Sequence, residues 1–150
     1  MPLYPNAARL IRANLEALQR GERVRAVAIG TLTSAQLSAI NQMRAAYGTP
    51  GALPPIIDEV LFVGHHVYKS RCIRDGYTIN DVLDQVAGAM DATAVSTNTN
   101  YMTAIENPTA RTDRYGNEVR DRAIFECTTR HPRPELFSVV PKGDTIKPKK

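Results

Sequence analysis

The residue types best suited to acid–base chemistry gather in one short segment of the chain. His65 and His66 are adjacent and are followed by Lys69 and Arg71, although the whole sequence holds only three histidines. A histidine titrates near neutral pH and can donate or accept a proton during a reaction. Lysine and arginine place fixed positive charge where negative charge develops in a transition state. These are the requirements for RNA cleavage without a metal ion, in which a base activates the ribose 2′-hydroxyl. In the alternative interpretation, one histidine packs in the core and the other caps a turn.

A second concentration of polar residues is the run of arginines between residues 111 and 133. It could form a phosphate-binding face, or it could be a solvated surface on which nearby acidic residues balance the positive charge. The arginines are Arg111, Arg114, Arg120, Arg122, Arg130 and Arg133, and the acidic residues are Asp113, Glu118, Asp121 and Glu126.

Other chemistries have weaker support in the sequence. Cys127 and His131 are four residues apart, and His66 and Cys72 are six apart, whereas structural zinc sites usually contain closer ligand pairs. The chain has no Gly-rich phosphate loop, no Gly-x-Ser-x-Gly motif and no His-Glu-x-x-His motif. We therefore expect no metal site and no cofactor.

Length and composition are typical of one globular unit. The 150 residues include 43% hydrophobic and 23% charged residues, which is the ordinary range for a folded domain. The net charge is +4, but four lysines against one aspartate in residues 142–150 supply +3 of it, so the body of the chain is nearly neutral. No apolar run approaches the roughly 18 residues of a membrane span. With two cysteines and no apolar leader, we expect a cytoplasmic protein that has no contact with a membrane.

The first third of the chain predicts two helices and a connector. Apolar residues recur at helical spacing from 6 to 20, and residues 23–29 alternate like a short strand. Thr33 followed by Gln36 is a capping-box signature for a helix that ends before Gly48. Four Pro and Gly residues between 48 and 55 then predict a linker.

The remainder predicts a sheet with one helix. An apolar run at 56–63 indicates a buried strand, and Thr78 with Asp81 begins a helix over 78–90 with an apolar stripe. Strands are predicted at 101–105, 119–129 and 136–140. We therefore predict an α+β fold in which helices precede a helix packed on an antiparallel sheet of three to four strands. The predicted parts are a helical N-terminal region (1–47), the linker (48–55), an α+β core domain (56–141) and a basic flexible tail (142–150).

Residues 56–141 resemble the small ribonuclease toxins of the barnase, EndoU, colicin and RelE-like group, which phages and other mobile elements carry. The resemblance rests on Arg71, then Asp75-Gly76-Tyr77, then the helix that starts at Thr78. It departs from the group's His-x3-Arg-x3-Arg-Gly pattern, since Asp75 stands where a basic residue is usual and His66 lies one residue too early. The resemblance implies an active site on the face of a compact sheet.

Carried over to this chain, the resemblance implies roles for eight residues. His65 or His66 would be the general acid or base, and Lys69 and Arg71 would hold phosphate. On the later strands Arg120 and Arg122 share one face, with Thr128 in phase and His131 close by. The expected partners are RNA and a possible cognate inhibitor or other protein.

Two functions remain open at this stage. One is a metal-independent ribonuclease-like domain, and the other is a non-catalytic immunity, inhibitor or adaptor protein that binds a partner macromolecule. The enzyme hypothesis requires residues 65–71 to be helical or sharply bent after a strand that ends near Val63. It also requires the site to open towards the face that carries Arg120 and Arg122.

Overall fold

A computed structural model gives the fold of this chain. It describes residues 3–46, 55–56, 59–91, 94–99 and 102–127, together with the strand residues 135–136, 138–139 and 142–143. The predicted sites Thr128 and His131, and the predicted linker up to residue 54, lie outside the described residues.

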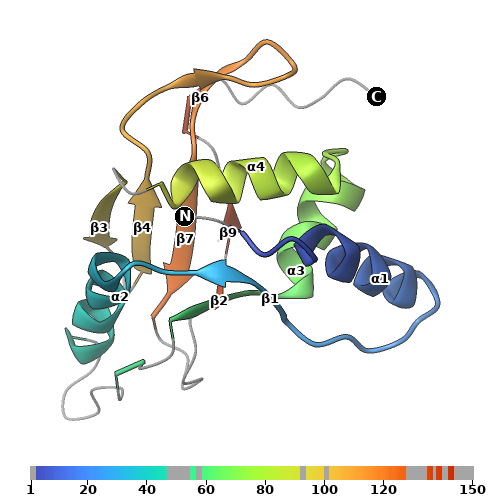
Figure 1. The fold of residues 1–150 in the computed structure, drawn as a ribbon, viewed down its shortest axis with the longest axis horizontal. Helices are drawn as coiled ribbons and strands as arrows, with labels where there is room; N and C mark the ends of the chain where they lie inside the picture. Colours follow the sequence, from blue (N-terminus) through green and yellow to red (C-terminus); the bar gives the residue numbers. More distant parts are fainter. Residues whose placement is uncertain are drawn as a thin grey trace.

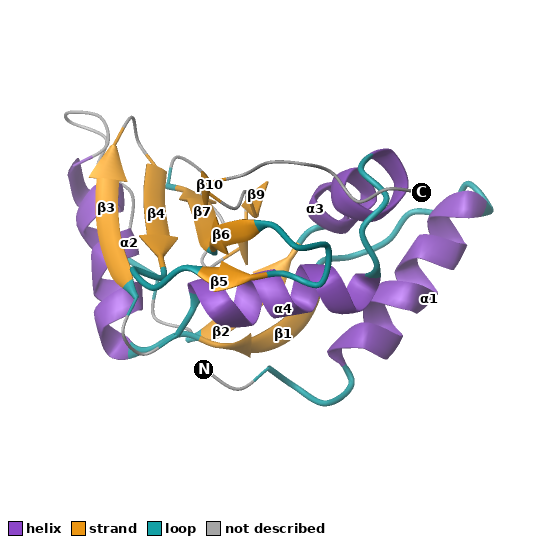
Figure 2. Cartoon of the chain, turned by 90° about the horizontal axis from the view of Figure 1, so that it is seen from above, coloured by secondary structure: helices purple, strands orange, loops and turns teal. Residues whose placement is uncertain are grey.

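The main sheet has four strands in the order β3-β4-β7-β9, and every neighbouring pair is antiparallel (Figure 2). On β4, Thr103 and Ile105 are buried while Ala104 and Glu106 are half-buried. This alternation gives the sheet one face towards the core and one outer face. The strands are β3 (Val95–Thr99), β4 (Met102–Glu106), β7 (Arg122–Glu126) and β9 (Ser138–Val139).

Helix α4 (Ile79–Ala89) covers the core face of this sheet and packs against β7 (Figure 1). Thr78 and Asp81 form the predicted capping box, in which each side chain accepts a hydrogen bond from the other residue's backbone N–H. The inward side of the helix carries Val82, Val86, Ala89 and Met90, all buried. The α+β class and the helix on an antiparallel sheet are thus confirmed.

The N-terminal part joins the same core. Helix α1 (Ala7–Gln19) packs against β1 and α4, and helix α2 (Ser34–Ala46) packs against β3 and β4. The predicted capping box at Thr33 and Gln36 is present, with both hydrogen bonds formed.

A second sheet connects the two sides of the predicted linker. Strand β1 (Val27–Thr31) pairs antiparallel with β2 (Val60–Val63), and β2 pairs in parallel with β8 (Glu135–Leu136). One continuous core contains Ile11 and Ile29 as well as Val86 and Phe125. Residues before and after the predicted linker therefore share a sheet and a core.

The last part of the chain differs from its predicted strands. The predicted strand 119–129 is divided into β6 (Glu118–Arg120) and β7, because Asp121 between them points into the interior and is only 1% exposed. Strand β6 joins a small separate sheet with β5 (Arg111–Thr112) and β10 (Lys142–Gly143), so the first residues of the predicted tail belong to a strand. Within the described part of the chain, no helix is long and apolar enough to cross a membrane.

The position of the core face of the main sheet predicts that two aliphatic strand residues contribute very differently to the free energy of unfolding. Ile105 is 0% exposed, whereas Val95 on the edge strand is 55% exposed. Replacing Ile105 with Ala should lower the free energy of unfolding by about 2–5 kcal/mol, because it leaves a cavity. Val95→Ala is the control and should change it by less than about 0.5 kcal/mol. Equal effects in urea melts would contradict this placement of the core.

Candidate functional site

The histidine segment is helical. Strand β2 ends at Val63, Gly64 follows in extended conformation, and α3 (His65–Tyr68) continues directly into a π-helical turn, η1 (Lys69–Arg74). The requirement that residues 65–71 be helical after this strand is met. Val67 and Tyr68 are buried and fix the segment to the core. The Tyr68 hydroxyl accepts a hydrogen bond from Asn14 of α1 at 3.0 Å, and burial raises the pKa of this phenol.

Three predicted catalytic side chains lie exposed on this helical segment. The His65 and His66 rings are 6.3 Å apart between centroids and nearly perpendicular, at 84°. Lys69 is also exposed. Because it is three residues after His66, it lies on the same side of the helix. The structure therefore brings two imidazoles and one ammonium group together at the surface, with neither histidine in the core.

Arg71 has a different environment. Its guanidinium Nη1 donates to Asp75 Oδ2 at 2.7 Å, and Arg74 Nε donates to the other oxygen of the same carboxylate at 3.0 Å. Asp75 is only 3% exposed. A buried carboxylate needs such partners. The Arg71 guanidinium is therefore engaged in an ion pair with Asp75. The i,i+4 spacing of these two residues is the sequence signal for this pair.

Arg120 and Arg122 line one cleft on the outer side of the main sheet. The cleft has a volume of about 440 Å³, and its other lining residues include Thr97 and Glu106. Arg120 Nε lies 3.4 Å from Glu106 Oε1. The structure thus places the two predicted phosphate-binding arginines together, with a hydroxyl and a carboxylate beside them.

This cleft and the histidine segment are separate. Segment α3–η1 lies at the N-terminal end of α4, whereas β3 and β4, which form much of the cleft, lie at its C-terminal end (Figures 1 and 2). The segment that carries the histidines and the strands that form the arginine cleft therefore lie in different regions of the fold.

The cysteines are free thiols. Cys127 is buried beside Thr103 Oγ1 at 3.4 Å, and Cys72 is half-buried. Burial, with a smaller contribution from Asp81, raises the pKa of Cys72 to about 11, so this thiol stays protonated at neutral pH. Among the described residues, no group of three or more His, Cys, Asp or Glu side chains could hold a metal ion.

A polar cluster that the sequence did not predict joins the β5–β6 hairpin to the start of α4. The Tyr115 hydroxyl donates to Asp81 Oδ2 at 2.6 Å, and Arg114 Nε lies 2.8 Å from Asp81 Oδ1. The Tyr77 and Tyr115 rings meet edge to face at 5.9 Å, and the Arg114 guanidinium lies 4.8 Å from the centre of the Tyr115 ring. Asp81 therefore caps the helix and also holds the hairpin tip.

The other end of the hairpin docks on the last turns of α4. Arg111 forms a bidentate pair with the buried Asp121, with nitrogen–oxygen distances of 2.6 and 2.9 Å. This carboxylate lies directly against Gly88, where an added Cβ would overlap it. The hairpin thus runs along α4 from Asp81 to Gly88 (Figure 1).

Comparisons with protein-family models, with curated proteins and with solved structures found no match for this chain.

The Asp81 contacts predict a pH-dependent loss of stability. Burial alone would raise the pKa of this carboxyl, but hydrogen bonds from Tyr115, Thr78 and Arg114 outweigh it and lower the pKa. The stabilisation is therefore present at neutral pH and disappears as the pH falls below about 4. Asp81→Asn should lower the free energy of unfolding by about 1–3 kcal/mol at pH 7, with a smaller difference at pH 3. Asp84→Asn changes an exposed carboxylate of the same helix and is the control. A deficit for Asp81→Asn that is as large at pH 3 as at pH 7 would contradict the role of the charge.

The close approach of Asp121 to Gly88 predicts that Gly88→Ala destabilises the protein, which is the opposite of the usual effect in a helix. In a helix interior, Gly→Ala normally stabilises by about 0.5–1 kcal/mol. Here the new Cβ would lie 2.8 Å from Asp121 Cγ, and the pair with Arg111 holds that carboxylate in place. Gly88→Ala should therefore lower the thermal midpoint. An Asp121→Ala background removes the carboxylate and leaves only a Cβ contact of 3.1 Å, so the same substitution should lower the thermal midpoint less there than in the wild type. An equal loss in both backgrounds would argue against the clash.

Proposed function

We propose that this protein cleaves RNA without a metal ion, and that His65 and His66 transfer the protons. The observation that carries the proposal is the pair of exposed imidazoles, 6.3 Å apart, on a helix anchored to the core. Two imidazoles can act as base and acid in the same turnover, which is the division of roles that phosphodiester transfer needs. The chain provides both within two consecutive residues.

In the proposed reaction every proton has a defined origin and destination. One imidazole removes the proton of the ribose 2′-hydroxyl, and the resulting oxygen attacks the adjacent phosphorus. The bond from phosphorus to the 5′-oxygen breaks, and the second imidazole, in its protonated form, gives its proton to that oxygen. The products are a 2′,3′-cyclic phosphate and a free 5′-hydroxyl. Lys69 would stabilise the additional negative charge on the phosphate oxygens in the transition state.

The cleft with Arg120 and Arg122 supports a binding role in the same function. Two guanidinium groups beside a threonine hydroxyl suit contact with a phosphodiester backbone. Because the cleft is separate from the histidines, it would hold a part of the RNA strand at a distance from the cleaved bond.

A second candidate is a non-catalytic protein that binds a partner macromolecule, such as a cognate inhibitor or another protein. The observation in its favour is that carboxylates neutralise much of the cationic surface. Arg71 pairs with Asp75, Arg111 with Asp121, and Arg114 with Asp81. A surface with charges paired in this way suits contacts with a protein better than contacts with a polyanion.

Purified protein should degrade RNA in the presence of excess chelator. His66→Ala should lose about 10²–10⁴-fold of the rate, because a general acid or base contributes that much. His65→Ala should lose a similar factor, and Lys69→Ala should also lower the rate while Lys69→Arg retains part of it. The measurement is single-turnover cleavage of a panel of labelled RNAs, with circular dichroism to confirm folding.

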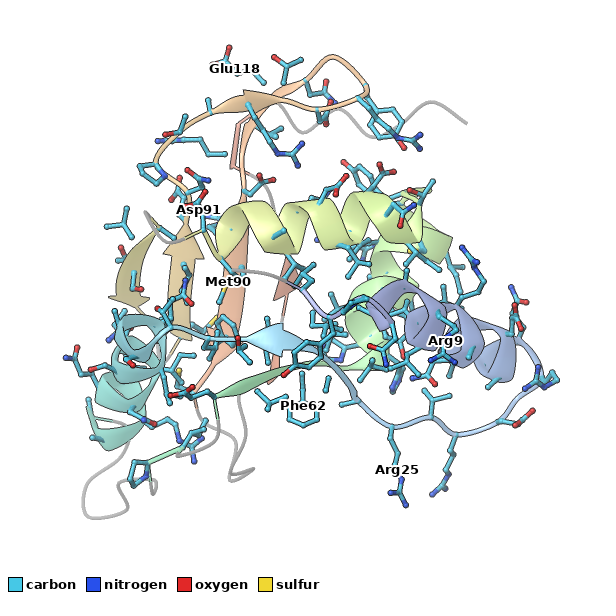
Figure 3. The ribbon with its side chains drawn as sticks, in the orientation of Figure 1. Arg9, Arg25, Phe62, Met90, Asp91 and Glu118 are labelled. Carbon is cyan, nitrogen blue, oxygen red and sulfur yellow. The ribbon has the colours of Figure 1, made fainter. Side chains whose placement is uncertain are left out.

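Arg25→Ala is the matched control, because Arg25 is an exposed cation whose side chain points into solvent on the connector between α1 and β1 (Figure 3). It should cleave at the wild-type rate. If wild type and His66→Ala both leave the panel intact, the enzyme proposal is wrong and the partner-binding function takes its place.

A further inference from the structure

A small polar cavity lies between α4 and the β5–β6 hairpin, and the function proposed above does not use it. Its volume is about 40 Å³, and its lining includes Tyr77, Asp84, Gln85, Arg111, Arg114 and Tyr115. This volume exceeds that needed for one water molecule. The cavity can therefore admit a small polar group, although a whole ring would have to stay outside.

One group in the lining of this cavity lacks a hydrogen-bond donor. Gln85 is only 4% exposed, and its carbonyl Oε1 has no hydrogen-bond partner among the residues that the structure describes. Buried polar atoms in folded proteins are nearly always paired, because an unpaired one loses its hydration without compensation. The Gln85 carbonyl can therefore accept a hydrogen bond from a donor group of a ligand that enters the cavity.

Aromatic rings and a guanidinium group form the wall of the cavity on the hairpin side. The Tyr77 and Tyr115 rings are inclined at 70° to each other, and the Arg114 guanidinium lies over one face of the Tyr115 ring; these three side chains form the stacking platform. Tyr77 and Tyr115 are half-buried and Arg114 is exposed, so ligands can reach this stacking platform. Tyrosine rings and arginine planes are the surfaces on which unpaired bases stack.

The charges around the cavity favour a neutral donor. Arg111 and Arg114 lie in its lining and disfavour a cation, while Asp81, Asp84 and Asp113, which also line it, disfavour an anion. A neutral N–H donor therefore suits the cavity, and a planar ring attached to that donor suits the platform outside it. We infer that this cavity and its platform bind an unpaired nucleobase that carries an exocyclic amino group, with the amino group on Gln85 Oε1 and the ring on the platform.

The site is next to the histidine segment, and the inference rests on the proposed function in RNA cleavage. The backbone N–H of Tyr77 donates to the Arg71 carbonyl of η1 at 3.0 Å, and η1 continues α3 without a break. A base held here would belong to a nucleotide near the histidines. Adenine and cytosine carry the required amino group and uracil does not, so the site would select among RNA sequences.

The test measures binding separately from cleavage. Oligonucleotides with a 2′-O-methyl backbone have no free 2′-hydroxyl and cannot undergo the proposed reaction. Because all six tyrosines contribute to the emission of the protein, binding is measured by the fluorescence anisotropy of labelled hexamers. Hexamers of adenosine and cytidine should bind roughly 5-fold or more tightly than the uridine hexamer, which lacks the hydrogen bond to Gln85.

Three variants and one control separate the contribution of the hydrogen bond to Gln85 from the contribution of stacking to hexamer binding. Gln85→Leu should reduce adenosine and cytidine binding to the uridine level, while uridine binding stays unchanged. Tyr77→Leu should weaken all three roughly 5- to 150-fold through lost stacking, whereas Tyr77→Phe keeps the ring face and should stay within about 2-fold of wild type. Glu118→Gln is the control, because this exposed carboxylate of the same hairpin points away from α4 (Figure 3).

Each outcome has a definite meaning. Equal binding of the three hexamers, or a Gln85→Leu variant that retains the preference, overturns the amino-base site. If the protein cleaves RNA but binds no hexamer, the inference is wrong and the proposed function stands. If the hexamers bind as expected but RNA remains intact, the site stands and the catalytic proposal fails. If the protein neither binds nor cleaves, both are wrong and a protein partner is indicated.

Discussion

The Asp81 carboxylate is the contact on which the arrangement at the start of α4 depends. It accepts hydrogen bonds from the backbone N–H of Thr78 and the hydroxyl of Tyr115, and it forms an ion pair with the guanidinium of Arg114. One buried charge therefore fixes both the first turn of the helix and the tip of the hairpin. The hairpin strands β5 and β6 are only two and three residues long. Strands this short offer little apolar surface, and the hairpin therefore depends on polar contacts at its two ends.

These buried carboxylates also determine which cations remain for a polyanionic ligand. Asp75, Asp81 and Asp121 are all less than 10% exposed, and each is paired with at least one arginine. A buried carboxylate that lost its partner would carry a large desolvation penalty, so these arginines cannot leave without cost to the fold. Positive charge for a ligand must therefore come from other cations, such as the exposed Lys69 and Arg25.

Local signals in the sequence predicted the elements that depend on local interactions. The capping boxes at Thr33 and Thr78 predicted where two helices begin, and the apolar stripe after Ile79 predicted the helix that covers the sheet. The enzyme hypothesis required residues 65–71 to be helical or sharply bent, and the structure shows that they are helical. The break at Asp121 was not predictable in this way, because the Arg111 pair that stabilises it depends on the hairpin docking on α4. The same holds for the parallel pairing of β2 with β8, which joins segments about 70 residues apart in sequence.

The separation of the two exposed cationic regions constrains the ligand. The histidines lie on a helix whose Val67 and Tyr68 are fully packed in the core, and the arginine cleft lies on a paired sheet in that same core. The two supports lie at opposite ends of α4, so a ligand must span this helix to contact both. A polymer can, and binding at one region then raises its effective concentration at the other. The fold thus favours a strand of RNA over a small phosphate ester as the substrate of the proposed reaction, with an affinity that falls steeply as salt rises.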